Sequence, residues 1–159
     1  RRHTRSLCDW SSDVCSSDLR DGLRSSFETD IYCPIEKLWA IIGTWEDVSW
    51  VQHALDVRML PGAGRRVIFP QNQTLEENLI YADDNETTLV YEVIKSTMPV
   101  IFYQGTIRLS AIDPQSTKVQ YNNVYLPKEG LDPQQVKAGM DQSFQERFNW
   151  LQKEFDTRS

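Results

Sequence analysis

The chain is poor in the residues from which metal centres and disulfide frameworks are built. Its 159 residues include three cysteines and two histidines, and Cys8, Cys15 and His3 fall in an atypical N-terminal segment. Outside that segment only Cys33 and His53 remain. One cysteine cannot form an internal disulfide, and no cluster of histidine, cysteine and carboxylate residues has metal-ligand spacing. We therefore expect no metal site, no cofactor and no disulfide framework.

Long hydrophobic runs, an excess of positive charge and the usual catalytic motifs are also missing. No apolar run approaches the roughly 20 residues of a membrane-spanning helix. The formal net charge is −6, whereas nucleic-acid-binding proteins select basic faces. There is no glycine-rich phosphate loop and no serine-centred nucleophile motif. The sequence predicts neither a membrane span nor a nucleic-acid partner, and it leaves the oligomeric state open.

Residues 1–19 resemble a translated sequencing adapter. The blocks at 1–5 and 9–19 look like constant adapter sequence, and the residues between them would cover a variable index. We therefore expect residues 1–21 to be a non-native or disordered tail. We expect residues 22–159 to form one domain with room for a core. A cytoplasmic location is expected, although a foreign tail would leave a lost signal peptide open.

Short periodic segments predict a strand, two short helices and then a series of strands. Residues 24–31 alternate as a strand, and Pro34 suits the first turn of a helix over 35–42. Thr44 can cap a second short helix that continues through Trp50. Further strands are expected at 57–60, 66–69, 75–81, 88–94, 102–112 and 117–126.

The chain closes with a long amphipathic helix expected over 132–155. Its apolar residues recur at steps of three or four and form one stripe: Val136, Met140, Phe144, Phe148, Leu151 and Phe155. A helix of roughly 35 Å with one apolar side needs a large partner surface. We therefore expect an α+β fold. In it a curved antiparallel sheet of about six or seven strands wraps around this helix and leaves a cavity between them. The smaller side chains of the first half, including Val136 and Met140, are expected to cover the cavity.

Several short motifs follow in a fixed order. Pro34 and Trp39 lie in the first helix, a glycine-rich hairpin with arginine occupies 62–66, Glu77 precedes an acidic turn, and Met98 is followed by proline. Their order and spacing over residues 24–156 resemble the START-like helix-grip superfamily, and within it the bacterial polyketide cyclase/dehydrase-like group with the SRPBCC domain. The resemblance implies the fold but not the activity, because this fold serves carriers, receptors and enzymes alike.

Glu77 is the candidate catalytic residue. It shares a strand face with Leu75, Leu79 and Tyr81, so an inward face would place its carboxylate in the cavity. A buried carboxylate has a raised pKa and can act as a general acid or base. The alternative is a structural glutamate bonded to a neighbouring strand or to Arg66.

The ligand-binding candidates combine apolar walls with a few polar groups. Asn123 can orient a ligand carbonyl, the tyrosines can offer hydroxyl groups, and Arg65 and Arg66 can meet an anionic group. Together with Glu77 the candidates are Trp50, His53, Arg66, Tyr91, Tyr103, Asn123, Tyr125, Val136 and Met140. The alternatives are core aromatics, an asparagine at a strand irregularity, an exposed loop histidine and an exposed hairpin arginine.

The expected function is the binding of a small hydrophobic or aromatic molecule between the sheet and the C-terminal helix. An enzyme that resembles polyketide cyclases or dehydratases, with Glu77 as its acid/base group, is the alternative. A protein-interaction domain with a filled core is the weaker alternative.

Overall fold

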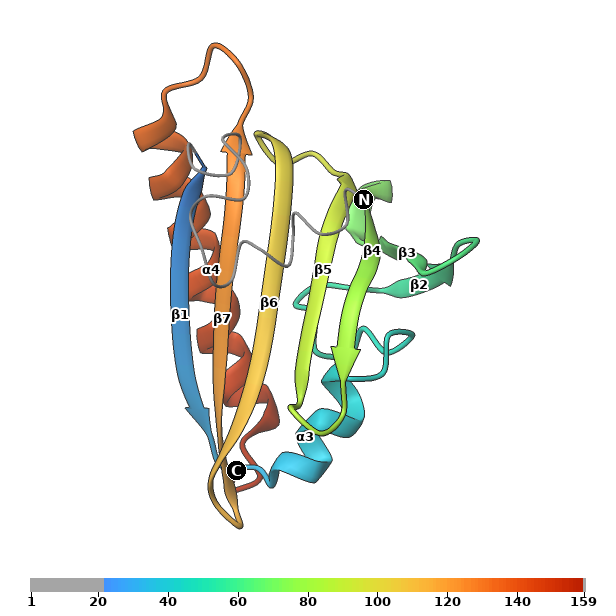
Figure 1. Ribbon diagram of the computed structural model, residues 1–159, viewed down its shortest axis with the longest axis vertical. Coiled ribbons are helices and arrows are strands. Elements are labelled where there is room, and N and C mark those ends of the chain that lie inside the picture. Colours follow the sequence, from blue (N-terminus) through green and yellow to red (C-terminus); the bar gives the residue numbers. More distant parts are fainter. Residues whose placement is uncertain (1–21, 159) are drawn as a thin grey trace.

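The computed structural model describes residues 22–158, and the predicted tail at 1–21 lies outside them (Figure 1). The elements of the described part are β1 (Leu23–Ile31), α3 (Ile35–Ile42), β2 (Asp56–Met59), β3 (Gly64–Ile68), η1 (Pro70–Asn72), β4 (Thr74–Asp83), β5 (Thr88–Lys95), β6 (Val100–Asp113), β7 (Ser116–Pro127) and α4 (Pro133–Phe155). Within residues 22–158, no helix combines the length and the hydrophobicity that a membrane crossing needs.

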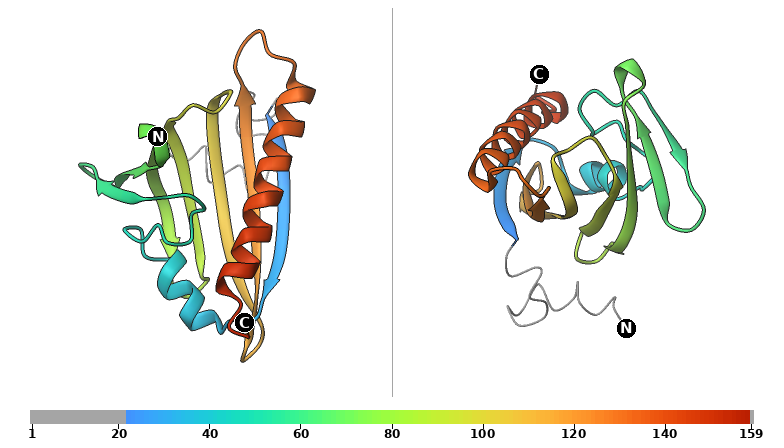
Figure 2. Two further views of the ribbon diagram at one scale, coloured as in Figure 1. Left: turned by 180° about the vertical axis from the view of Figure 1, so that it is seen from behind. Right: turned by 90° about the horizontal axis from the view of Figure 1, so that it is seen from above.

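All the strands of residues 22–158 belong to one antiparallel sheet of seven strands, in the order β1-β7-β6-β5-β4-β3-β2. The last strand, β7, returns to the first strand, and β1 pairs with it over its whole length. The sheet is strongly curved because adjacent strands twist relative to one another, and α4 lies along its inner side beside β1 and β7 (Figure 2). The predicted α+β helix-grip fold is confirmed.

The apolar stripe of α4 is buried as predicted. Its buried members are Val136, Met140, Phe144, Phe148 and Leu151. The ring of Phe27 in β1 lies 5.8 Å from that of Phe144 and 6.0 Å from that of Phe148, measured between centroids. Because full burial of one such side chain is worth roughly 1.5–3 kcal/mol, the stripe anchors α4 to the sheet.

The two helices begin near the residues that the sequence indicates. α3 follows Pro34 and ends before Gly43. At the start of α4, Asp132 Oδ1 accepts a hydrogen bond from the backbone N of Gln134 at 3.0 Å. Pro133 occupies the first helical position, where its missing N–H costs nothing.

The expectation of a second short helix from Thr44 to Trp50 is wrong, because this segment is a series of turns. Thr44 Oγ1 donates to the Ala40 carbonyl at 2.7 Å instead of capping a new helix. Asp47 Oδ1 accepts from the backbone N of Ser49 at 2.9 Å and from its Oγ at 2.6 Å. Such side-chain bonds stabilise turns and compete with helix formation.

The alternation of β4 is interrupted. Its pairing with β5 shifts between Glu76 and Glu77 and again between Leu79 and Tyr81. The second shift turns Tyr81 outward, where it is 45% exposed and donates its hydroxyl to Asp83 Oδ2 at 2.9 Å. The expectation that Tyr81 shares the inner face with Glu77 is therefore wrong, whereas Glu77 itself is buried.

Candidate functional site

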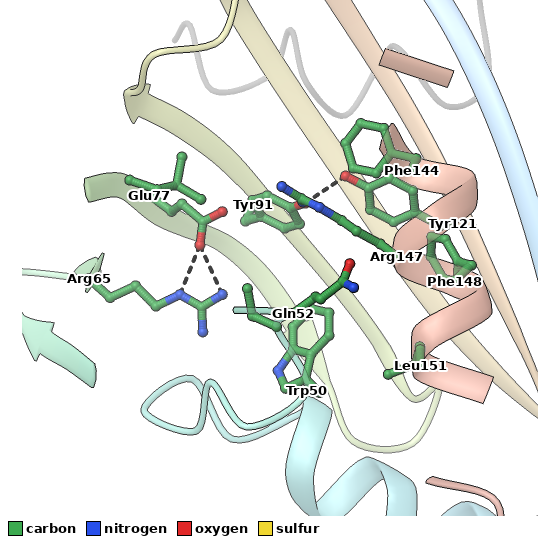
Figure 3. A pocket seen from close by; sticks show the side chains of 12 residues that line it. Trp50, Gln52, Arg65, Glu77, Tyr91, Tyr121, Phe144, Arg147, Phe148 and Leu151 are labelled. Carbon is green, nitrogen blue, oxygen red and sulfur yellow. Dashed lines mark hydrogen bonds and ion pairs between the residues drawn. The ribbon is translucent and has the colours of Figure 1, made fainter. Parts of the chain in front are cut away.

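The inner side of the sheet and the second half of α4 enclose a cavity with two adjoining compartments. The larger compartment has a volume of about 290 Å³ and the smaller one of about 50 Å³. Figure 3 shows the smaller compartment, with Trp50 and Leu151 at one end and Tyr91 and Arg147 at the other. The residues that line both are Gln52, Leu75, Glu77, Tyr91, Phe144 and Arg147.

A buried ion pair forms the polar wall of this cavity. Arg65 and Glu77 face each other in the β3–β4 pairing and are only 2% and 4% exposed. Arg65 Nε and Nη2 each lie 2.9 Å from Glu77 Oε1. Arg65 Nη1 donates to the Trp45 carbonyl at 2.8 Å, and the guanidinium lies 3.8 Å above the centre of the Trp45 ring. Arg65 is thus held on three sides.

The ion pair uses only one of the two carboxylate oxygens of Glu77. Both contacts with Arg65 go to Oε1, and Figure 3 shows the other oxygen on the side of Tyr91. Desolvation by burial raises the pKa of Glu77, while the charge and hydrogen bond of Arg65 and the charge of Arg147 oppose that rise. The free oxygen can accept a hydrogen bond or a proton from a molecule in the cavity.

Three tyrosine hydroxyls from neighbouring strands form a hydrogen-bonded network beside this wall. The oxygen of Tyr121 lies 2.6 Å from that of Tyr91 and is also in contact with that of Tyr103. Asn123 Nδ2 donates to the hydroxyl oxygen of Tyr103 at 3.1 Å. The network therefore spans β5, β6 and β7.

Gly105 makes this convergence possible. It lies between Tyr91 and Asn123 in the registers of β5, β6 and β7. A Cβ atom at Gly105 would stand 2.6 Å from the hydroxyl oxygen of Tyr121 and 2.9 Å from the ring of Tyr91. Only glycine leaves room for these two side chains to meet.

The orientation of the Asn123 amide sets the direction of this network. With Nδ2 directed at Tyr103, as here, Tyr103 can donate to Tyr121 and Tyr121 to Tyr91. In this arrangement the hydrogen of Tyr91 is available to a molecule in the cavity, because Tyr91 lines both compartments.

All three phenols stay protonated at neutral pH. Burial, assisted by the nearby Glu77 carboxylate, raises the pKa of Tyr91 to about 12. Burial also raises the pKa of Tyr103 and of Tyr121 well above the usual range. The tyrosines can therefore act as neutral hydrogen-bond donors in the cavity.

The structure places five of the predicted site residues on the wall of the cavity. Trp50 lines the smaller compartment, His53 and Tyr103 line the larger one, and Glu77 and Tyr91 line both. His53 is exposed and has a left-handed backbone with φ of 71°.

Arg66 does not line either compartment, which corrects its prediction as a ligand contact. Successive side chains of a strand point to opposite faces, so Arg65 faces inward and Arg66 outward. Arg66 Nε lies 2.9 Å from Glu76 Oε2, and the Arg66 side chain is 41% exposed.

Asn123 and Tyr125 lie behind the wall instead of on it. Asn123 reaches the cavity only through its hydrogen bond to Tyr103. Tyr125 is fully buried, and its ring stacks on that of Tyr103 with centroids 6.0 Å apart. Both residues therefore support Tyr103, and their prediction as direct ligand contacts does not fit this arrangement.

The expected division of α4 is reversed. Val136 and Met140, predicted to cover the cavity, belong to the hydrophobic core and line neither compartment. The second half of the helix, from Ser143 to Leu151, lines the cavity instead. Side-chain size along the helix therefore did not indicate which half lines the cavity.

Sequence reasoning missed Gln52, Gly105 and Arg147. Arg147 follows Phe144 by three residues and precedes Leu151 by four, so it flanks the apolar stripe on the helix surface. This spacing could have indicated that Arg147 lies close to the cavity. Gln52 lies in the segment that was expected to follow a helix. Among residues 22–158, no group of three or more histidine, cysteine or acidic residues is arranged to hold a metal ion.

Comparisons with known proteins agree with this architecture. Residues 23–155 match the family described as polyketide cyclase/dehydrase and lipid transport. No curated protein matches the chain in sequence. A Bacillus thuringiensis protein of known structure is 18% identical, with a TM-score of 0.77 over 84% of this chain and 98% of its own.

Two further structures resemble the chain at lower identity. The Zhui aromatase/cyclase from Streptomyces sp. R1128 is 11% identical, with a TM-score of 0.68 over 84% of this chain and 93% of its own. Ara h 8.0201 is 15% identical, with a TM-score of 0.65 over 84% of this chain and 97% of its own. These likenesses show the fold, and the family match extends over most of the sequence. The chain belongs to the polyketide cyclase/dehydrase and lipid transport family of the START-like SRPBCC superfamily.

Proposed function

We propose that this protein binds a small hydrophobic or aromatic molecule in the cavity between its sheet and α4. The observation that carries the proposal is the cavity itself, whose smaller compartment has mainly aromatic and aliphatic walls and whose larger compartment adds polar side chains. Small-molecule sites have this composition, because apolar walls supply affinity and a few polar groups orient the ligand. A protein-interaction domain with a filled core is disfavoured by a cavity of about 290 Å³.

The size of the cavity restricts the ligand. The larger compartment, of about 290 Å³, lies just below the range of roughly 300–1,000 Å³ usual for ligand sites, and the smaller one adds about 50 Å³. A body of one or two rings suits this volume better than a long acyl chain. Trp50, Phe148 and Leu151 provide an apolar end for such a body.

A cavity-filling variant tests the binding function. Leu75 lines both compartments, so Leu75→Trp should block them, whereas Ile101→Trp adds the same ring at a 69% exposed position. Aromatic compounds of one and two rings, 2-naphthol among them, should raise the Tm of the wild type and of Ile101→Trp but not of Leu75→Trp. If no compound stabilises the wild type, the binding proposal is wrong.

A second candidate function is an enzyme resembling polyketide cyclases or dehydratases, with Glu77 as general acid or base. One observation favours it, namely the buried Glu77 carboxylate whose free oxygen lies on the side of Tyr91 (Figure 3). Glu77→Gln should then abolish turnover of a β-keto substrate that the wild type converts. Unchanged turnover would remove Glu77 from the mechanism.

A further inference from the structure

Arg147 projects a positive charge into the cavity from α4. It lines both compartments, is half-buried, and its guanidinium carbon lies 5.1 Å from the centre of the Phe144 ring. Figure 3 shows the side chain reaching from the helix toward Tyr91 and Tyr121. An arginine in this position crosses the space that a ligand would occupy.

This charge is not neutralised by an ion pair within residues 22–158. Glu77 is held by Arg65, so these two charges balance each other. Glu146 lines the larger compartment but is exposed and makes no ion pair with Arg147. The described part of the chain therefore leaves the five N–H donors of Arg147 available to a ligand.

A second donor lies close to the guanidinium. With Asn123 Nδ2 directed at Tyr103, the Tyr91 hydroxyl keeps its hydrogen for a molecule in the cavity. Arg147, Tyr91 and Glu77 line both compartments, and Figure 3 shows the Arg147 side chain beside the Tyr91 hydroxyl. A planar guanidinium beside a hydroxyl donor is suited to a carboxylate, which accepts through two oxygens.

We propose that Arg147 and the Tyr91 hydroxyl form an anion-recognition subsite, and that the ligand is a small aromatic or aliphatic carboxylate. The carboxylate lies against Arg147 and Tyr91, and the apolar body lies toward Trp50, Phe148 and Leu151. The proposal rests on the proposed binding function and adds the charge of the ligand to it.

Two probes of equal size separate charge from shape. Binding of 2-naphthoate and of the neutral 2-naphthamide is measured by isothermal titration at pH 7.5. The wild type should prefer the naphthoate by roughly 10- to 100-fold, the range expected for hydrogen bonds to a charged group. Arg147→Gln should remove that preference and leave the amide unchanged, Arg147→Lys should restore part of it, and Tyr91→Phe should weaken naphthoate several-fold.

Stability and surface charge are controlled separately. Arg147 is half-buried and makes no hydrogen bond in the described part of the chain, so Arg147→Gln should fold with an unchanged Tm. Arg108→Gln removes an exposed arginine that pairs with Glu86, and it should bind both probes like the wild type.

Each outcome decides the proposal. If both probes bind the wild type equally, or if Arg147→Gln weakens both to the same degree, the subsite is wrong while the binding function stands. If neither probe binds the wild type, the subsite is wrong, and the thermal screen of one- and two-ring compounds decides the binding function separately. If Arg147→Gln loses the preference for naphthoate and still binds naphthamide like the wild type, the subsite is supported.

Discussion

Arg65 holds a single oxygen of Glu77 with two of its nitrogens, each at 2.9 Å, and leaves the other oxygen free. Both side chains are buried, so the attraction between the two charges is weakly screened. Glu77 therefore serves the stability of the sheet and the chemistry of the cavity at once. Any loss of function on changing Glu77 has to be compared with the loss of stability.

Glu77→Gln should lower the free energy of unfolding by roughly 3–5 kcal/mol. The change leaves the Arg65 guanidinium buried without its counter-charge, which is costlier than losing an exposed pair. Urea denaturation at pH 7 measures the difference. Activity assays of this variant are then made at a temperature where it is fully folded.

The neighbouring pair provides the matched control. Glu76 and Arg66 lie one residue along the same two strands with the same 2.9 Å separation, but the Arg66 side chain is 41% exposed. Glu76→Gln should therefore cost less than about 1 kcal/mol. Equal losses in Glu76→Gln and Glu77→Gln would show that burial is not the deciding factor.

Gly105→Ala should destabilise the protein by about 1–3 kcal/mol and disturb the tyrosine network. Its new Cβ would stand 2.6 Å from the Tyr121 hydroxyl oxygen, so the Tyr91 and Tyr121 rings must move. Thermal unfolding measures the cost, and binding of the naphthyl probes reports the change in the cavity.

The same substitution elsewhere should have the opposite sign. Gly139 lies within α4, and a Cβ there would meet nothing within 4 Å. Gly139→Ala should stabilise the protein by roughly 0.5–1 kcal/mol, because alanine restricts the unfolded chain and favours the helix. A loss of stability at Gly139 would contradict the steric explanation for Gly105.

Stability should fall with rising pH above about pH 10. Tyr91 has a pKa of about 12 in the folded protein, whereas an unfolded chain releases this proton near pH 10. Between these values the unfolded state binds fewer protons, so the free energy of unfolding decreases as pH rises. Tyr91 alone accounts for about 1.4 kcal/mol at pH 11.

Denaturation curves between pH 8 and pH 11 measure this dependence. Tyr91→Phe lacks the ionisable group, so its stability should fall less steeply over the same range. Identical slopes for the two proteins would show that the Tyr91 phenol ionises equally in the folded and unfolded states.

Met140→Trp should cost stability and leave ligand binding nearly unchanged. Met140 is buried in the core and lines neither compartment, so a larger ring overpacks it at a cost of about 1–3 kcal/mol. Naphthoate titration and urea denaturation separate the two effects. A large loss of affinity with little loss of stability would show that the first half of α4 contacts the ligand.

Several parts of the site could be read from periodicity, and others could not. Alternation made Glu77 a candidate for the cavity, Tyr91 was a candidate ligand contact, and both line the cavity. Arg66 was chosen as the ligand contact, but Arg65 faces the cavity. An error of one residue in the strand register places every side chain on the opposite face. Tyr81 was misplaced because a register shift in β4 has no sequence signal of its own.

The sequence by itself determined the seven strands, α3 and α4 and their order, since the apolar period of a strand or helix is a local property of the chain. It placed the apolar stripe of α4 and the residue that caps its first turn, because both depend only on residues a few positions apart. The tertiary structure alone decided which half of α4 faces the cavity, and which side chains meet there. Arg147, Tyr91 and Tyr121 lie on three different elements, and only the curvature and register of the sheet bring them together (Figure 3).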